Sequence, residues 1–427
     1  MKRFAIQQLE KWKDSSRRKP LIIEGARQVG KTWLVKEFAF QHYKNMVYVN
    51  FEEQKHLREL FEIDFDINRI LTAIKAASHQ EIVPEETLIF FDEIQDAEHG
   101  LTSLKYFLEN APELHVIAAG SLLGIELHRD SSFPVGKVSF LQLKPMSFFE
   151  FLIALGEERL VKILEASDWD NITLFASKLK EFLKMYYYVG GMPEAVLAFS
   201  ANRDFDEVRE IQRDILRGYD FDFSKHAPDD IVPRIGQLWN SLPAQLSKEN
   251  RKFIYGLVKE GARAREYESA LQWLVDAGLV YRIYNVSAPR IPLKSYEDMS
   301  AFKLYALDVG LLGAMTSIDS ETVTEGNLIF TEFKGALTEQ YVLQTLILHH
   351  QPFYFSKTNS RLEIDFLIQE KGNVIPFEVK AEENLRARSL RQFVADYLPK
   401  EAYRLSMADY RKESWMTNVP LYAAETL

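Results

Sequence analysis

The sequence predicts an α/β fold with a parallel sheet covered by helices, followed by helical and mixed segments. Short apolar runs alternate with helical patterns over roughly the first third of the chain. One run, residues 88–91, is uninterrupted, which is typical of a strand buried on both faces of a parallel sheet. A glycine-containing loop separates the first apolar run from the helical pattern after it.

The chain has 427 residues, of which 47% are hydrophobic, so several well-packed domains are expected. The formal net charge of −10 argues against bulk electrostatic binding of nucleic acid. Cysteine is absent, which excludes disulfides, thiolate zinc sites and a thiol nucleophile, and fits a cytoplasmic location. The basic N-terminus lacks a following apolar core, and no apolar run is long enough to span a bilayer.

The expected elements of the first domain follow in order along the chain. A short amphipathic helix is expected at residues 4–13. The candidate strands are residues 21–24, 46–50, 88–91, 115–119 and 138–143. The candidate helices between them are residues 32–40, 67–77 and 101–110.

Breaks in the pattern divide the chain into four expected domains. A Lys-Pro-Met break ends the first at residue 145, and a helical lid or linker follows to residue 232. Two helical patterns, a glycine turn and a proline-containing hairpin predict a winged helix over residues 233–320. A helix at 333–349 and strand-like runs at 352–356, 362–368 and 374–380 open the last domain, 321–427.

The clearest motif of the chain is GxxxxGKT, which follows the first apolar run. A strand, a glycine-containing loop and a helix start favour a phosphate-binding loop, because glycine lets backbone amides turn toward an anion. We expect Lys31 to reach the β- and γ-phosphates of ATP and the Thr32 hydroxyl to bind Mg²⁺. The whole loop comprises Gly25, Ala26, Arg27, Gln28, Val29, Gly30, Lys31 and Thr32.

The uninterrupted apolar run ends in two acids, Asp92 and Glu93. Ligands of open α/β sheets bind at the carboxyl ends of the strands, where these acids are expected. We expect Asp92 to hold Mg²⁺ through water and Glu93 to act as general base on the attacking water. Ser121, after the next strand, either senses the γ-phosphate or caps a helix.

These motifs resemble those of the prokaryotic AAA+ ATPases that carry a C-terminal domain of unknown function. The similarity also includes residues 143–148, 190–194 and 303–312, and therefore covers essentially the whole chain. It implies an ATPase fold, ATP with Mg²⁺, and the roles given above to the loop and the two acids.

Arg129 and Lys137 are candidate cations for the transition state, with a solvated surface charge as the alternative. Members of the family that the chain resembles often have Gly-Arg where this chain has Gly136 and Lys137. Because lysine lacks the planar fork of arginine, this departure weighs against a finger role for Lys137.

A second group of charged residues lies on a predicted antiparallel hairpin whose turn is near Gly372. This turn places Asp365 opposite Glu378, and the alternation of side chains puts Lys380 on the same face. Two such carboxylates repel each other unless a cation lies between them, and Mg²⁺ accepts one or two carboxylates. Lys380 is then placed to stabilise developing charge or to orient a hydrolytic water.

This D…ExK arrangement resembles the PD-(D/E)xK nuclease superfamily. The resemblance matches Asp365 and Glu378 to its metal ligands, Lys380 to its catalytic lysine, and Glu339 to an acid on the preceding helix. Glu339 also shares a helical face with apolar residues, which predicts a buried position. The resemblance implies a restriction-endonuclease-like α/β domain; a hairpin with a solvated Glu–Lys face is the structural alternative.

The sequence therefore leads to three functional hypotheses. The first is an ATP-hydrolysing AAA+-type protein with a nuclease-like domain that acts on nucleic acid. The second is a signalling ATPase that binds a protein or DNA partner without cutting, and the third is a transcription regulator. Nucleic acid, a protein partner and further copies of the chain are the expected partners, and no membrane is expected.

Overall fold

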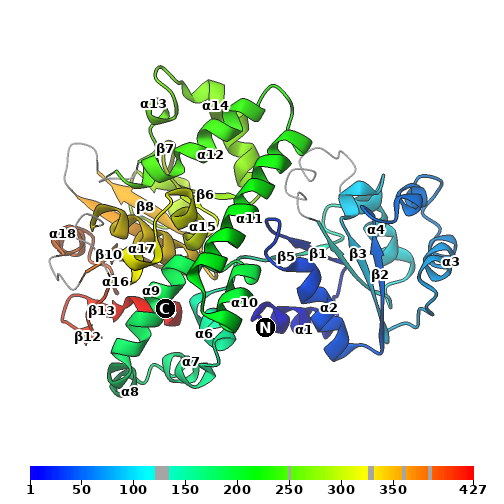
Figure 1. Cartoon of the computed structure of the whole chain (residues 1–427), viewed down its shortest axis with the longest axis horizontal. Helices are drawn as coiled ribbons and strands as arrows, with labels where there is room; N and C mark the ends of the chain where they lie inside the picture. The colour runs from blue at the N-terminus through cyan, green and yellow to red at the C-terminus, as the bar shows by residue number, and fades with distance from the viewer. Residues whose placement is uncertain (121–133, 249–251, 326–330, 358–361, 383–386) are drawn as a thin grey trace. The chain divides into compact units, whose positions relative to one another are not determined.

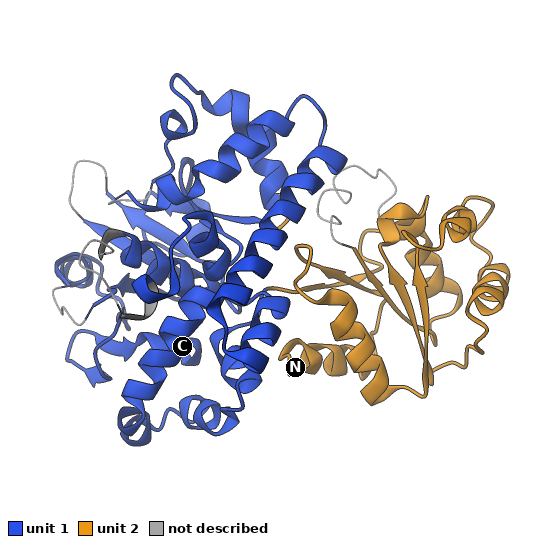
Figure 2. Ribbon diagram, in the orientation of Figure 1, with its two compact units in different colours: residues 1–2, 145–275, 279–427 blue, residues 3–144, 276–278 orange. Residues whose placement is uncertain are grey.

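The computed structural model describes residues 1–120, 134–248, 252–325, 331–357, 362–382 and 387–427 (Figure 1). The chain divides into two compact units (Figure 2). The N-terminal unit comprises residues 3–144 with 276–278, and the C-terminal unit comprises residues 1–2, 145–275 and 279–427.

The N-terminal unit is built on a sheet in which all strands run parallel, in the order β2-β3-β4-β1-β5. The predicted parallel sheet is therefore confirmed. The strands of this sheet are β1 (Leu21–Glu24), β2 (Asn45–Asn50), β3 (Thr87–Asp92), β4 (His115–Ala119) and β5 (Ser139–Gln142).

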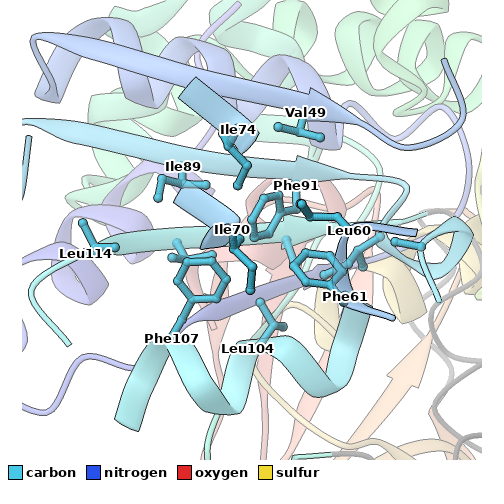
Figure 3. Close-up of a cluster of buried hydrophobic side chains, with 14 of the residues drawn as sticks. Val49, Leu60, Phe61, Ile70, Ile74, Ile89, Phe91, Leu104, Phe107 and Leu114 are labelled. Carbon is cyan, nitrogen blue, oxygen red and sulfur yellow. The ribbon is translucent and has the colours of Figure 1, made fainter. Parts of the chain in front are cut away.

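Helices cover both faces of this sheet. Residues of β3 alternate between the two faces, and every one of them is buried. Ile89 and Phe91 pack with side chains of α3 and α4 in the core shown in Figure 3, whereas Phe90 contacts Tyr48 on the other face, beside α2. The helices of this unit are α1 (Ala5–Lys13), α2 (Lys31–His42), α3 (Ile67–Ser78) and α4 (Gly100–Asn110), with 3-10 turns at Lys55–Phe61 and Ile94–Asp96.

The apolar spacing of each helix explains which face it buries. In α3, Ile67, Ile70 and Ile74 share one face, and all three are buried. The Asp66 side chain caps this helix by accepting a hydrogen bond from the Asn68 amide. Each fully buried apolar side chain contributes about 1.5–3 kcal/mol to stability, so this face accounts for the docking of α3 on the sheet.

The C-terminal unit begins with a helical part. Its longest helix is α11 (Phe205–His226), and a break at Gly190 ends α9. The remaining helices of this part are α6 (Phe148–Ala154), α7 (Glu158–Glu165), α8 (Trp169–Leu174), α9 (Ala176–Val189), α10 (Pro193–Asn202), α12 (Val232–Leu246), α13 (Tyr255–Val258) and α14 (Ala264–Asp276).

A mixed sheet follows, with the order β12-β13-β11-β10-β9-β8-β6-β7 in the described residues. Its strands are β6 (Val280–Val286), β7 (Glu297–Ala306), β8 (Phe353–Ser356), β9 (Glu363–Glu370), β10 (Asn373–Val379), β11 (Tyr403–Ser406), β12 (Arg411–Lys412) and β13 (Thr417–Pro420). The associated helices are α15 (Val309–Met315), α16 (Ser320–Glu325), α17 (Thr331–Leu346) and α18 (Arg388–Tyr397), with 3-10 turns at Leu293–Tyr296 and Leu421–Thr426.

The β6–β7 hairpin of the expected winged-helix segment belongs to this same sheet. Asn285 of β6 pairs in parallel with Tyr354 of β8, and the Asn285 side chain accepts a hydrogen bond from the Ser356 amide. The predicted hairpin is present as β6 and β7, and the helix expected at residues 266–277 is present as α14. Of the helix expected at residues 250–260, the described residues form only the short α13. The segments 233–320 and 321–427 therefore share one sheet.

Asp308 joins three parts of the C-terminal unit. Its buried carboxylate accepts hydrogen bonds from the Gly191 amide at 2.7 Å, the Leu311 amide at 3.1 Å and the Gln344 side chain at 3.3 Å. Gly190 has a φ of 71°, and a Cβ there would lie 2.0 Å from Asp308 Oδ2. The Gly-Gly turn is therefore required for this contact.

None of the helices in the described residues is both long and apolar enough to cross a membrane.

Candidate functional site

The GxxxxGKT segment forms the loop between β1 and α2, as predicted. Gly25 and Gly30 have positive φ values of 147° and 92°, and Gln28 adopts a φ of 67°. A Cβ at Gly25 would lie 2.3 Å from the Leu143 carbonyl oxygen, so only glycine fits there. Ala26 and Val29 are buried, whereas the Gln28 side chain is exposed at the loop.

Lys31 is the first residue of α2 and lies buried against the loop. Its ammonium group donates hydrogen bonds to the carbonyls of Gly25 at 2.7 Å and Ala26 at 2.9 Å. Burial lowers the pKa of Lys31 to about 8, and the nearby carboxylates of Glu93 and Asp92 oppose that shift. The cation is therefore held at the loop in an environment that favours an anionic partner.

Asp92 ends β3, where it pairs in register with Asn50 of β2 and Ala119 of β4. Its carboxylate accepts hydrogen bonds from the Thr32 hydroxyl at 2.8 Å and from the Tyr48 hydroxyl at 3.0 Å. Burial raises the pKa of Asp92, and these two hydrogen bonds act in the opposite direction. The structure thus brings together the two residues expected to hold Mg²⁺.

Glu93 follows directly after β3, at the carboxyl end of the sheet. It adopts a left-handed φ of 50°, a conformation that costs a non-glycine residue about 1–2 kcal/mol. The Gln95 side chain donates a hydrogen bond to the Glu93 carboxylate at 2.6 Å. The turn and this hydrogen bond set the direction of Glu93, which interacts electrostatically with Lys31.

Arg3 is a residue of this site that the sequence reasoning missed. Its buried guanidinium donates to the Val29 carbonyl at 3.0 Å and to the Lys144 carbonyl at 2.7 Å. It therefore ties the phosphate-binding loop to the chain just after β5. A lone arginine ahead of an amphipathic helix carries no local signal of such a contact.

Ser121, Arg129 and Lys137 were also predicted to contribute to this site, and the structure describes one of them, Lys137. Ser121 and Arg129 lie outside the described residues. Lys137 forms an ion pair with Glu109 at 2.8 Å, with the two side chains 41% and 35% exposed. This pairing gives Lys137 a local structural partner.

The predicted hairpin in the C-terminal unit is confirmed as β9 and β10. Phe366 pairs with Phe377, so the next positions in the same register are Asp365 and Glu378. The Asp365 carboxylate accepts a hydrogen bond from the Val379 amide at 2.7 Å. The Lys380 ammonium forms an ion pair with the Glu378 carboxylate at 2.8 Å. The three predicted residues therefore lie together.

Glu378 is the most buried member of this group. Its side chain is 6% exposed, against 36% for Lys380. Its second carboxylate oxygen accepts a hydrogen bond from the Leu390 amide, in the first turn of α18. Burial raises the pKa of Glu378, whereas Lys380 lowers it.

Glu339, the predicted third acid, lies elsewhere. It is buried, as expected, but it accepts a hydrogen bond from Tyr305 and lies 3.4 Å from the Lys303 ammonium. Lys303 also pairs with Glu363 at 2.9 Å. Within the described ranges, no group of three or more His, Cys, Asp or Glu side chains could hold a metal ion. Glu339 therefore does not complete a three-carboxylate site, because the buried Lys303 and Tyr305 hold it.

Two further polar residues lie near Glu378, on the next two strands of the same sheet. Arg404 of β11 pairs in register with Glu378, and Asn418 of β13 pairs with Arg404. The Arg404 guanidinium donates to the Asn418 side chain at 2.9 Å, and both residues are buried. Only the parallel register of β10, β11 and β13 brings them next to Glu378, so the sequence did not reveal them.

Family comparisons divide the chain into three matched parts. Residues 17–152 match the family model described as an AAA domain. Residues 180–322 and 334–423 match two families described as domains of unknown function, DUF8612 and DUF4143.

We refer to residues 17–152, which match this model, as the AAA domain. None of the curated proteins matches the chain.

Similar solved structures include the Walker-type ATPase of Pyrococcus abyssi, with 16% identity and a TM-score of 0.44. It is matched over 73% of this chain and 94% of its own. The ORC1 protein of Aeropyrum pernix, in complex with DNA, has 12% identity and a TM-score of 0.28, over 73% and 91%. Cdc6p of Pyrobaculum aerophilum has 12% identity and a TM-score of 0.25, over 75% and 93%. Likeness at this level says nothing of what this chain binds.

The residues of the AAA domain fit Mg²⁺ together with a nucleotide. Thr32 and Asp92 offer a hydroxyl and a carboxylate oxygen, which are the ligand types that Mg²⁺ prefers. Bound there, Mg²⁺ would neutralise part of the phosphate charge. In the C-terminal unit, Asp365 and Glu378 offer the one or two carboxylates that Mg²⁺ accepts alongside its waters.

Proposed function

We propose that this chain binds ATP with Mg²⁺ in its AAA domain, hydrolyses it, and uses the cycle to control a C-terminal unit that acts on nucleic acid. The observation that carries the first part is the hydrogen bond between Thr32 and Asp92. It joins the end of the phosphate-binding loop to the carboxyl end of β3, as a shared Mg²⁺ site requires.

Each residue of the AAA domain has a distinct part in this proposal. The loop amides and Lys31 bind the phosphates, and Thr32 and Asp92 hold the metal. Glu93, held by Gln95 after β3, takes a proton from the attacking water. Arg3 keeps the loop in its binding conformation through the Val29 carbonyl.

Two measurements test this part of the proposal. Titration calorimetry of the full chain with ATP and Mg²⁺ should show binding, and release of inorganic phosphate should show turnover. Lys31→Ala should abolish binding, because it removes the cation that contacts the phosphates. If the wild-type chain gives no heat with ATP or GTP plus Mg²⁺, the proposal is wrong.

For the C-terminal unit we propose metal-dependent cleavage of nucleic acid at Asp365, Glu378 and Lys380. Support comes from the register that places the two carboxylates side by side and from the Lys380 ammonium at 2.8 Å from Glu378. Asp365 and Glu378 would hold the metal, and Lys380 would stabilise charge on a phosphate under attack.

The test is incubation of single- and double-stranded DNA and RNA with the chain, ATP and Mg²⁺ or Mn²⁺. Cleavage is expected for the wild type and should be lost in Glu378→Ala and Lys380→Ala. Lys371→Ala is a matched control on the same hairpin, since Lys371 pairs with Glu370 at the turn, away from Glu378. Equal cleavage by Glu378→Ala, or none by the wild type, rules out this nuclease site.

A second candidate function is a nucleotide-dependent binding protein that does not cut. One observation favours it: both Glu378 oxygens have partners within the chain, Lys380 and the Leu390 amide. A carboxylate satisfied in this way is also stable as a structural group. Capture of a partner with ATP but not ADP, without cleavage by the wild-type chain, would favour this function.

A further inference from the structure

A cavity of about 350 Å³ opens at the turn end of the β9–β10 hairpin, within the C-terminal unit. We call it the hairpin-end pocket. It is formed by the β6–β7 connection, the hairpin turn and the end of α18, and its lining includes Arg290, Ile291, Phe393, Tyr397, Leu398 and Lys400. Its volume is within the range of pockets that bind small ligands or single side chains of a partner.

The apolar lining of this pocket is unusually open to solvent. Leu398 is 79% exposed, Ile291 is 44% exposed and Tyr397 is 37% exposed. Leu398 also has a left-handed φ of 48° at the C-cap of α18, a conformation that disfavours a branched side chain. Both the left-handed backbone and the exposure of a leucine to water cost free energy of folding. Their combination at Leu398 points to a role for this side chain in binding.

The floor of the pocket is rigid. Phe393 is fully buried and packs against Tyr397, with 4.7 Å between the ring centroids and an angle of 40° between the ring planes. Phe355 contacts the same two rings, at 5.8 Å and 5.7 Å. This aromatic cluster fixes the apolar floor in place, so an entering apolar side chain meets a preformed surface.

The charged side chains of the lining are both basic. Arg290 and Lys400 are exposed, and in the described residues no carboxylate forms an ion pair with either. The nearby acids have other partners: Glu370 pairs with Lys371, and Glu401 accepts a hydrogen bond from Tyr403. In a chain of net charge −10, an apolar pocket with two basic residues and no acid in its lining is complementary to an acidic ligand.

We propose that the hairpin-end pocket binds an apolar side chain of an acidic peptide segment in a partner protein. Leu398, Ile291 and Tyr397 would surround the apolar side chain, and Arg290 and Lys400 would pair with flanking carboxylates. A peptide fits better than a nucleic acid, because a polyanion needs many basic contacts and the lining of this pocket offers two, Arg290 and Lys400.

The pocket is separate from the site of Asp365 and Glu378. Glu378 lies six positions after Gly372 along β10, which corresponds to about 20 Å of extended strand. Binding at the pocket therefore neither requires nor excludes chemistry at Glu378.

The experiment is a peptide array probed with the full chain. It carries short peptides with one central leucine or phenylalanine flanked by aspartates, together with versions in which the apolar residue is alanine or the aspartates are lysine. The strongest fluorescein-labelled peptide is then titrated by polarisation, with an expected dissociation constant on the order of 10 µM. Affinity should fall with added salt.

Two variants each remove one feature of the pocket, either its two basic side chains or its exposed leucine. Arg290→Glu combined with Lys400→Glu should weaken peptide binding at least about tenfold, and so should Leu398→Asp. Lys412→Glu is the matched control and should leave binding unchanged, since Lys412 is also exposed but lies on the edge strand β12, outside the lining of the pocket.

Four results would overturn the proposal. They are no selective peptide on the array, equal binding of the alanine peptide, unchanged binding by both pocket variants, and displacement of the peptide by a single-stranded oligonucleotide with matching loss in the variants. Since the pocket variants leave Lys31 and Glu378 intact, their ATPase and nuclease assays report the proposed function independently.

Discussion

The Thr32 hydroxyl donates a hydrogen bond to the Asp92 carboxylate at 2.8 Å, although 60 positions separate the two residues in the sequence. Strands β1 and β3 end at the same edge of one parallel sheet, with β4 between them, and this contact lies at that edge. The loop after β1 and the acid at the end of β3 thereby become one site. The hydroxyl, and not the bulk of the threonine, is the group that matters.

Removing that hydroxyl should therefore lower ATP turnover without preventing the chain from folding. We expect Thr32→Ala to lower Mg²⁺-dependent ATP turnover by about 100-fold, because one metal ligand is lost. Thr32→Ser keeps the hydroxyl and should retain most activity. The measurement is phosphate release across a Mg²⁺ titration; equal activity of the alanine and serine variants would contradict the assignment.

Glu93→Gln should bind ATP with nearly wild-type affinity and turn it over about 100- to 10,000-fold more slowly, as expected when a general base is removed. Calorimetry and single-turnover hydrolysis give the two quantities. Gln95→Ala is a useful companion, since Gln95 only orients Glu93 and should cause a smaller loss. Wild-type turnover in Glu93→Gln would show that another group is the base.

ATP affinity should fall as the pH rises above about 8. Burial lowers the pKa of Lys31 from 10.5 to about 8, so the free protein loses this proton in that range, whereas bound phosphate favours the charged form. Affinity should then fall by up to about tenfold per pH unit. Titration of a fluorescent ATP analogue at several pH values measures this, and constant affinity up to about pH 9 would contradict the prediction.

The stability of the ligand-free chain should change with pH in the opposite sense. Between pH 8 and pH 10.5, Lys31 is protonated in the unfolded chain but not in the folded one. This group alone therefore makes the free energy of unfolding rise with pH across that window. Lys31→Met should remove the contribution, which thermal unfolding at several pH values can detect.

Arg3→Met should weaken ATP binding by about tenfold and lower stability by about 1–3 kcal/mol, because the carbonyls of Val29 and Lys144 lose their buried donor. Arg17→Met is the matched control, since Arg17 is exposed near the same helix. Nucleotide titration and thermal unfolding supply the readouts. Unchanged ATP affinity in Arg3→Met would mean that the loop keeps its conformation without this support.

Asp308→Ala should destabilise the C-terminal unit by about 3 kcal/mol or more, because the Gly191 and Leu311 amides and the Gln344 side chain lose a common acceptor. Asp308→Asn, which keeps one acceptor oxygen, should lose less. ATP binding by the AAA domain should persist in both variants. Thermal unfolding of the three proteins compares them, and equal midpoints would show that other contacts hold the turn.

The sequence predicted the N-terminal sheet well because its strands are short apolar runs bounded by turns. The expected strands at residues 21–24 and 115–119 match β1 and β4 residue for residue, and the other three differ from β2, β3 and β5 by one residue at one or both ends. The C-terminal hairpin could be predicted equally well, because the position of the turn at Gly372 alone sets the register that places Asp365 opposite Glu378.

What the sequence could not predict depends on contacts between distant segments. Arg3 reaches Val29 and Lys144 only after the sheet has formed, and Arg404 reaches Glu378 only through the parallel pairing of β10 with β11. Glu339 was correctly expected to be buried. Its partner could not be foreseen, because Lys303 comes from β7, which no local pattern relates to that helix.

The pairing of β6 with β8 also bears on how the protein can be divided. A fragment that starts after residue 320 would remove β6 and leave the β8 backbone without its neighbour on that side. Unprotected edges of this kind recruit strands from other molecules. Such a fragment should therefore self-associate, whereas one that retains the hairpin should stay dispersed.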